Sequence, residues 1–244
     1  MTLNPKKNIC LNYHNLGYGP QVGINKIHPR IFENHIKIID GFLSKHNDID
    51  ISITFDDGYE NIFKYAYPIL SNSKIREKKV FIITDYIGKK NSWDFSFYFN
   101  QYNHLDKNQI KMLHANGWGV GSHGVSHNSF LSMNKSDAKK EIFDSKRIIE
   151  DIISDKVESI APPFSHINQG IYDICVDAGY KSIYIQNEAP IDQVKGVELY
   201  LRNNIYSIDS NRNIIKKINF NPAENNKEKI ISSFNNLTVL FSRI

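Results

Sequence analysis

Cysteine is scarce in this sequence, and long apolar runs are absent. Cys10 and Cys175 are the two cysteines among 244 residues, and they lie far apart without forming a CxxC pair. A disulfide framework is therefore excluded, and we expect both thiols to be reduced. No segment approaches the roughly 20 apolar residues that a membrane-spanning helix requires, so we expect no transmembrane segment.

The N-terminal stretch lacks the apolar core of a secretory signal. Residues 1–15 read MTLNPKKNICLNYHN, in which polar and basic residues interrupt every apolar group. We therefore expect a cytoplasmic location. An upstream signal or anchor in a longer gene product would overturn this expectation.

The chain also lacks a strong excess of either charge. Thirty Lys and Arg residues against 26 Asp and Glu residues give a formal charge of +4, and the basic residues form only short runs such as residues 74–79. A nucleic-acid-binding protein would show a denser basic stripe. A phosphate-binding glycine loop is missing as well, which argues against a nucleotide-cofactor enzyme.

Strand-like and helix-like segments alternate along the chain. Eight runs have the β-branched and aromatic content of strands: 8–14, 51–55, 78–84, 118–122, 157–161, 181–186, 203–208 and 237–242. Helical patterns fit between most of them, including one that begins at Pro29 and two that end at Gly117 and Gly179. This order predicts an α/β fold with a mainly parallel sheet, open or closed into a barrel, in one domain over residues 1–244.

Two adjacent carboxylates follow the strand predicted at 51–55. The stretch ISITFDDGYEN places Asp56 and Asp57 at the end of an apolar run and before Gly58, which permits a sharp turn. Successive side chains on a strand point to opposite faces, so the two carboxylates are expected to have different roles. Either they belong to a site at the carboxyl ends of the strands, or one of them caps a helix over residues 60–70.

Two histidines follow the strand predicted at 118–122. In VGSHGVSHNS, His123 and His127 lie four residues apart in a stretch whose glycines and serines favour a loop. Two imidazoles and one carboxylate form a metal-binding set that leaves positions open for water and substrate. The alternative is a pair of hydrogen-bonded histidines in a surface turn. Because both motifs end parallel strands, both are expected at the same rim of the sheet.

With these two motifs, the sequence resembles the polysaccharide deacetylase, or NodB-homology, family. The likeness rests on TFDDGYEN followed by GSHGVSHNSFLSM, and it extends to Tyr13-His14, to PPF at 162–164 and to DAGYKSIY at 177–184. It implies a distorted (β/α) barrel of about seven to eight mainly parallel strands. It also implies a hydrolase that removes an N-acetyl or related acyl group from an amino sugar or a polysaccharide precursor.

The resemblance implies roles for individual residues. One divalent metal would bind Asp57, His123 and His127, with zinc as the first expectation and Co, Ni, Fe or Mn as alternatives. Asp56 would be the general base that takes a proton from the attacking water. Pro163 and Phe164 would contact the substrate, which is expected to be an N-acetylated sugar or glycan.

The sequence departs from the family pattern in its later motifs. Ala161 stands where the third motif has an Arg that pairs with the base, and Arg202, grouped with the substrate-binding residues, is a candidate replacement or a solvated surface residue. Ser242 stands where the fifth motif has the general-acid His. His14 is the predicted catalytic replacement because it ends the first strand, and His166 is the alternative. A satisfied core histidine remains an equally open interpretation of His14. The fourth motif is not found.

Two functions therefore remain open from the sequence. The first is a metal-dependent sugar deacetylase with an altered acid and an altered base-orienting residue. The second is a catalytically weakened relative that binds a carbohydrate or a protein partner. Because the expected metal ligands and base are all present, the sequence favours the enzyme.

Overall fold

Seven parallel strands close into a barrel in the computed structural model, which describes residues 7–19, 24–91 and 102–219. The strands follow the order β1-β4-β5-β6-β7-β8-β9, and β9 pairs with β1 to close the barrel. Their bounds are Lys7–Tyr13 (β1), Ile49–Phe55 (β4), Lys78–Ile82 (β5), Gly119–Ser122 (β6), Ser159–Ile160 (β7), Ser182–Ile185 (β8) and Glu198–Asn204 (β9). The chain is thus an α/β barrel, and the open-sheet alternative is excluded.

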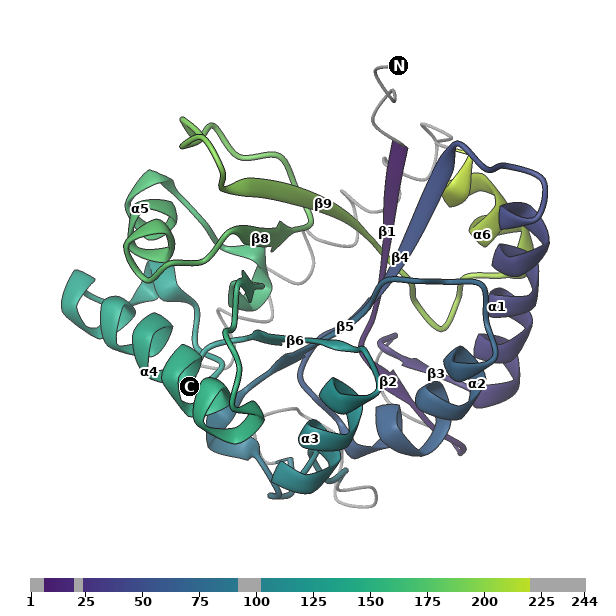
Figure 1. Ribbon diagram of the computed structural model, residues 1–244, viewed down its shortest axis with the longest axis horizontal. Helices are drawn as coiled ribbons and strands as arrows, with labels where there is room; N and C mark the ends of the chain where they lie inside the picture. Colours follow the sequence, from purple (N-terminus) through teal and green to yellow (C-terminus); the bar gives the residue numbers. More distant parts are fainter. Residues whose placement is uncertain (1–6, 20–23, 92–101, 220–244) are drawn as a thin grey trace.

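Helices surround the barrel on its outside (Figure 1). Helix α1 lies beside α6, while α4 and α5 cover the opposite side (Figure 1). The helices are α1 (Pro29–Leu43), α2 (Tyr67–Ser71), α3 (Lys107–Ala115), α4 (Lys135–Ile153), α5 (Gln169–Asp177) and α6 (Asn211–Ile218). A short parallel pair, β2 (Asn15–Leu16) and β3 (Lys26–Ile27), lies outside the barrel sheet. None of the helices in the described part of the chain is both long and apolar enough to span a membrane.

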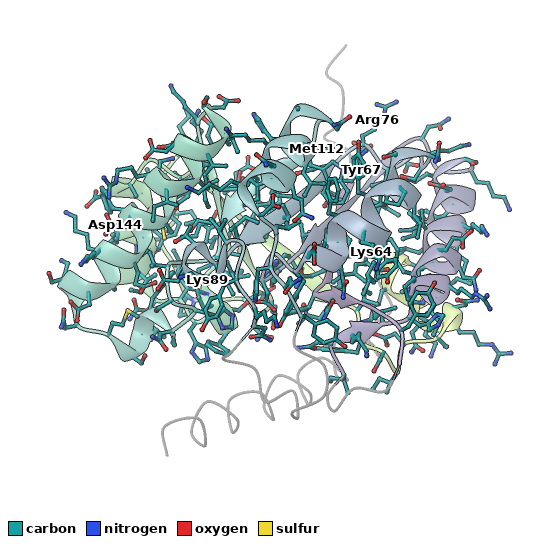
Figure 2. All side chains as sticks on the ribbon, turned by 90° about the horizontal axis from the view of Figure 1, so that it is seen from below. Lys64, Tyr67, Arg76, Lys89, Met112 and Asp144 are labelled. Atoms are coloured by element: carbon teal, nitrogen blue, oxygen red, sulfur yellow. The ribbon has the colours of Figure 1, made fainter. Side chains whose placement is uncertain are left out.

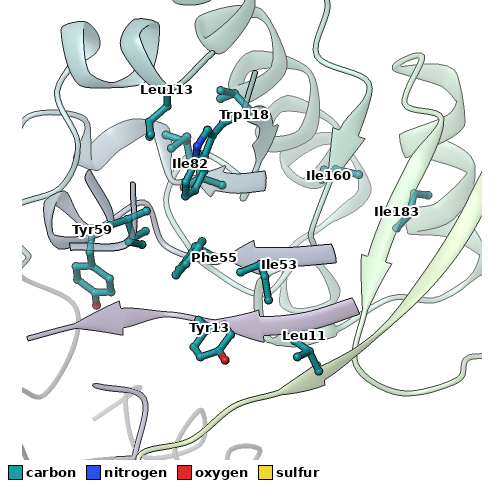
Figure 3. Close-up of a cluster of buried hydrophobic side chains, with 14 of the residues drawn as sticks. Leu11, Tyr13, Ile53, Phe55, Tyr59, Ile82, Leu113, Trp118, Ile160 and Ile183 are labelled. Atoms are coloured by element: carbon teal, nitrogen blue, oxygen red, sulfur yellow. The ribbon is translucent and has the colours of Figure 1, made fainter. Parts of the chain in front are cut away.

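The main hydrophobic core lies between the strands and the helices. Alternate strand residues such as Leu11, Tyr13, Ile53 and Phe55 face outward into this core (Figure 3). Phe55 stacks on Trp118, which lies between α3 and β6, and the two ring centroids are 5.8 Å apart. Charged side chains of both signs project from the outer helix faces, as Lys64 and Asp144 illustrate (Figure 2). Burial of one strand face against helices therefore stabilises the barrel from outside.

The inside of the barrel has a different composition. The residues that alternate with the outer core include polar and small side chains that are almost fully buried: Cys10, Asn12, Ser52, Thr54, Ala161, Arg202 and Asn204. Phe81 fills part of the interior next to Gly121, where an added Cβ would lie 2.5 Å from the Phe81 ring. The interior can therefore hold hydrogen-bonded polar groups directly beneath the rim at the carboxyl ends of the strands.

The predicted elements agree with the structure except at a few places. The strand expected at 203–208 instead spans Glu198–Asn204, because the residues that pair with β8 begin at Glu198. The helix expected at 60–70 is a π-helical turn at Ile62–Ala66 that continues into α2. Gly117 and Gly179 follow α3 and α5 with φ of 79° and 81°, as expected for C-terminal glycines. Helix α6 was not predicted, and the strand expected at 237–242 lies outside the described residues.

Two glycine substitutions test the packing with opposite expected signs. Gly121→Ala is expected to destabilise the fold by about 1–3 kcal/mol, because its Cβ would also lie 2.9 Å from the backbone oxygen of Ser159. Gly41→Ala is expected to stabilise it by about 0.5–1 kcal/mol, because Gly41 is exposed in α1 with no atom within 4 Å of an added Cβ. Urea unfolding of both variants measures the two changes, and a neutral Gly121→Ala would contradict this packing.

Buried His35 predicts a loss of stability in mild acid. It lies in α1 with its Nδ1 3.4 Å from the Tyr13 hydroxyl, and Asp209 and Lys217 are its charged neighbours. Burial lowers the pKa of His35 from 6.5 to about 4, although Asp209 opposes the shift. Between pH 6.5 and pH 4 the histidine is therefore protonated in the unfolded chain and neutral in the folded protein. The contribution of His35 to the free energy of unfolding is complete above pH 6.5, and it falls by about 3 kcal/mol as the pH drops toward 4.

The measurement is the free energy of unfolding from urea titrations between pH 7 and pH 4. His35→Leu, which cannot titrate, is expected to lose less stability over this range than the unmodified protein. Equal pH slopes for the two proteins would show that His35 does not carry the effect.

Candidate functional site

Polar side chains gather at the carboxyl ends of three barrel strands, of which β1 and β4 are adjacent and β6 is separated from β4 by β5. His14 follows β1, Asp56 and Asp57 follow β4, and His123 follows β6. His127 comes from the loop after β6 and reaches back to the same place. The prediction that both motifs meet at one rim is confirmed by their contacts.

The turn after β4 separates the two carboxylates. Asp57 has φ of 70° and Gly58 has φ of 68°, so the chain makes two consecutive left-handed residues immediately after the strand. At Gly58 an added Cβ would lie 2.9 Å from Ile82 Cδ1, which adds a steric reason for glycine. The next helical turn begins at Ile62 with Asn61 at its N-cap and without a side-chain cap bond. The alternative in which an Asp caps this helix is therefore wrong.

Asp57, His123 and His127 form a compact group of potential metal ligands. Asp57 Oδ1 lies 3.5 Å from His123 Nε2 and 3.3 Å from His127 Nε2. One ligand atom from each of the three residues lies within 4.8 Å of the others, and all three residues are buried. The His123 Nδ1–H donates to the Ala161 carbonyl at 2.6 Å, which turns Nε2 toward Asp57 and leaves it as the nitrogen available to a metal. The donor set and its orientation therefore fit a divalent metal.

The electrostatic environment keeps both carboxylates ionised. Burial alone would raise the pKa of Asp57, but hydrogen bonds from His123 and His127 hold it well below its usual value. Burial lowers the pKa of His127, whereas at His123 the two carboxylates outweigh burial and raise the pKa. The group is thus an anion between two imidazoles, a set of charges that suits a cation.

Asp56 is held by a different set of partners. Arg202 Nη1 donates to Asp56 Oδ1 at 2.6 Å, and Asn12 Nδ2 donates to Asp56 Oδ2 at 3.0 Å. Burial would raise the pKa of Asp56, but Arg202, His123 and His14 outweigh it and lower the pKa. Arg202 is 2% exposed, so the interpretation of this residue as a solvated surface arginine is wrong. Its guanidinium lies over the Phe81 ring, 5.3 Å from the centroid.

Asn12 is a site residue that the sequence reasoning missed. Its Oδ1 accepts bonds from Arg202 Nη1 at 2.9 Å and from Thr54 Oγ1 at 2.7 Å. Its Nδ2 donates to Asn204 Oδ1 at 2.9 Å as well as to Asp56. Asn12 is the polar residue between Leu11 and Tyr13, two places before His14 on the same strand face, and this alternation was the available signal.

The other predicted residues lie around this centre at different depths. His14 Nε2 is 3.9 Å from Asp56 Oδ2, and its side chain is 14% exposed. Phe164 is 38% exposed with φ of 59°, and its ring lies 4.9 Å from that of His127, whereas Pro163 is buried. His166, the alternative acid, has its Nδ1 2.8 Å from Ser129 Oγ and its ring beside Phe164. Ser242 lies outside the described residues.

Comparison with known proteins agrees with this arrangement. The chain is 24% identical over 196 residues to YxkH of Bacillus subtilis, a protein that carries the name polysaccharide deacetylase. It is 25% identical over 174 residues to the poly-β-1,6-N-acetyl-D-glucosamine N-deacetylase of Staphylococcus aureus. These alignments cover 74% and 68% of the chain, which spans 64% and 57% of the respective relatives.

A solved structure shows the same fold. The Streptococcus pyogenes deacetylase PplD, determined in complex with acetate, superposes with a TM-score of 0.69 at 19% identity, covering 88% of this chain and 99% of that one. The sequence profile described as polysaccharide deacetylase matches residues 44–183, which include Asp56, Asp57, His123 and His127. Because that match covers more than half of the residues, the chain belongs to the polysaccharide deacetylase family.

Proposed function

We propose that the chain is a metal-dependent hydrolase that removes an N-acetyl or related acyl group from an amino sugar in a polysaccharide or its precursor. One observation carries the proposal: a buried Asp57, His123 and His127 group lies next to Asp56, a carboxylate that is engaged with Arg202 instead of with the two imidazoles. A carbohydrate-binding module would not require both a metal-ligand group and a separately held carboxylate beside it.

The ligand group and Asp56 divide the chemistry between them. Asp57, His123 and His127 would hold one divalent ion, with zinc first and Co, Ni, Fe or Mn as alternatives. When bound, such an ion lowers the pKa of water and polarises a carbonyl group. Asp56 would accept the proton of the attacking water, since Arg202 and Asn12 keep its carboxylate ionised and fixed in orientation.

His14 is proposed as the general acid that protonates the leaving amine. It lies on the rim, with its Nε2 3.9 Å from Asp56 Oδ2. His14 Nδ1 is buried without a hydrogen-bond partner among the described residues, so no hydrogen bond at that nitrogen fixes the ring as a purely structural histidine. Its position supports this role better than that of His166, whose ring contacts Ser129 and Phe164.

Phe164 and the curated relatives support a glycan substrate. An exposed aromatic ring beside the ligand His127 offers a flat apolar surface on which a sugar ring can pack. The Staphylococcus aureus relative is named for its action on a polymer of N-acetyl-D-glucosamine. We therefore propose an N-acetylated sugar or glycan as the substrate, with the exposed Phe164 ring at its binding surface; Pro163, which precedes Phe164, is buried and is not proposed to touch the sugar. Arg202 acts on Asp56 in this proposal, not on the substrate.

Substitution of the base and of a ligand tests the enzyme directly. Asp56→Asn is expected to retain zinc and to lower acetate release by at least about 100-fold, because the amide cannot accept the proton. His123→Ala is expected to lose both zinc binding and activity. Elemental analysis and acetate release from a panel of N-acetylated sugars measure the two effects, with Asp50→Asn at the exposed start of β4 as the control.

Metal-loaded protein that released no acetate or related acid from any sugar would contradict the hydrolase. That outcome would favour the second candidate, a deacetylase-like carbohydrate-binding protein, which sugar-binding measurements would then test.

A pair of histidine variants tests the general acid. His14→Gln is expected to lower kcat by about 100-fold while the zinc content stays unchanged, because glutamine cannot protonate the amine. His166→Gln is expected to have a much smaller effect on kcat. Steady-state kinetics of both variants provide the measurement, and the reverse order of effects would assign the acid to His166.

A further inference from the structure

A short extended segment is joined to the turn that carries Asp57. Leu105 N–H donates to the Gly58 carbonyl at 2.8 Å, and Glu60 N–H donates to the Asn103 carbonyl at 2.9 Å. Between these two bonds, Tyr59 and His104 form an antiparallel bridge. The segment is also bonded on its other side, where His104 N–H donates to the Lys89 carbonyl at 2.9 Å. The turn after β4 is therefore held from outside the barrel.

The His104 side chain adds one bond to this segment. Its Nδ1 lies 2.9 Å from the carbonyl oxygen of Asp57. A carbonyl oxygen only accepts, so Nδ1 carries the proton and donates it. The ring is 3% exposed and stacks on Tyr59 with centroids 4.8 Å apart. The opposite nitrogen, Nε2, is buried without a hydrogen-bond partner, which is unfavourable by itself.

The backbone of Asp57 requires such support. A non-glycine residue with φ of 70° is in the left-handed region, which costs an L-residue about 1–2 kcal/mol. In this conformation the side chain points to His123 and His127, with Oδ1 3.5 Å and 3.3 Å from their Nε2 atoms. A change of φ at Asp57 would rotate its carbonyl and its carboxylate together, because both are attached to Cα beyond the N–Cα bond. The bond that fixes the carbonyl thus also fixes the carboxylate.

We propose that His104 is a positioning residue of the metal site: its Nδ1–H bond to the Asp57 carbonyl holds the left-handed backbone that aims Asp57 Oδ1 at the two imidazoles. The inference rests on the proposed metal site and is independent of which acyl group or sugar is processed. His104 orients the ligand Asp57 through a hydrogen bond to its carbonyl, and the Ala161 carbonyl orients the ligand His123 through a hydrogen bond from its Nδ1–H. Such outer partners typically change metal affinity 10–100-fold when removed.

Three variants separate the hydrogen bond from the packing. His104→Phe keeps a ring against Tyr59 and removes the donor, and it is expected to weaken zinc binding by about tenfold or more. His104→Asn removes the ring and keeps a donor nitrogen near the place of Nδ1, and it is expected to bind zinc within about threefold of the unmodified protein. His104→Ala removes both and is expected to bind as weakly as His104→Phe. Zinc affinity is measured by competition with a chromophoric chelator, with no substrate present.

The control is His114→Phe, a matched substitution of a half-exposed histidine on α3 that pairs with Asp155 at 3.3 Å. It is expected to leave zinc affinity unchanged. Unmodified affinity in His104→Phe, or equal weakening in His104→Phe and His104→Asn, would overturn the proposal, because the donor would then not matter. If His104→Phe does not fold, the comparison of the Asn and Ala variants decides in the same way. Absence of zinc binding in the unmodified protein would instead contradict the metal site itself.

Discussion

The burial of two carboxylates that are neighbours in sequence is the constraint on which the rest of this structure depends. Asp56 and Asp57 are both almost fully buried, and an uncompensated buried anion is too costly to persist in its ionised form. Asp56 is compensated by Arg202, and Asp57 by the imidazoles of His123 and His127. Each carboxylate therefore has its own partners, and the sharp turn between them keeps the two sets apart.

The closed barrel makes the first compensation possible. Arg202 belongs to β9 and Asp56 follows β4, and β1 lies between these two strands. Asn12 on β1 bonds to both residues, so the ion pair is bridged across three adjacent strands. The register places Cys10 opposite Arg202 and Asn12 opposite Thr54, which brings these side chains into the interior at matching heights. An open sheet without the β9–β1 pairing would leave Asp56 without its cation.

The second compensation explains the strained backbone at the rim. Both Asp57 and His127 have positive φ, and both contribute to the ligand group. Strain of this kind persists only where surrounding contacts fix the chain, and it is common at functional sites. At Asp57 the contacts come from outside the barrel, through residues 102–105, while the Ala161 carbonyl after β7 orients the ligand side chain of His123. The ligand geometry is thus a property of the packed fold and not of the two motifs alone.

The sequence by itself determined the alternation of strands and helices, the parallel α/β class and the two motifs at the rim. These features follow from local patterns: apolar periodicity, the turn glycine after Asp57, and the spacing of His123 and His127. The sequence left open whether Arg202 was buried, gave no role to Asn12 or His104, and placed β9 several residues too late. Tertiary structure alone decided these points, because Arg202 and Asp56 are 146 residues apart and His104 and Asp57 are 47 residues apart. Contacts over such separations depend on barrel closure and strand register, which no local pattern encodes.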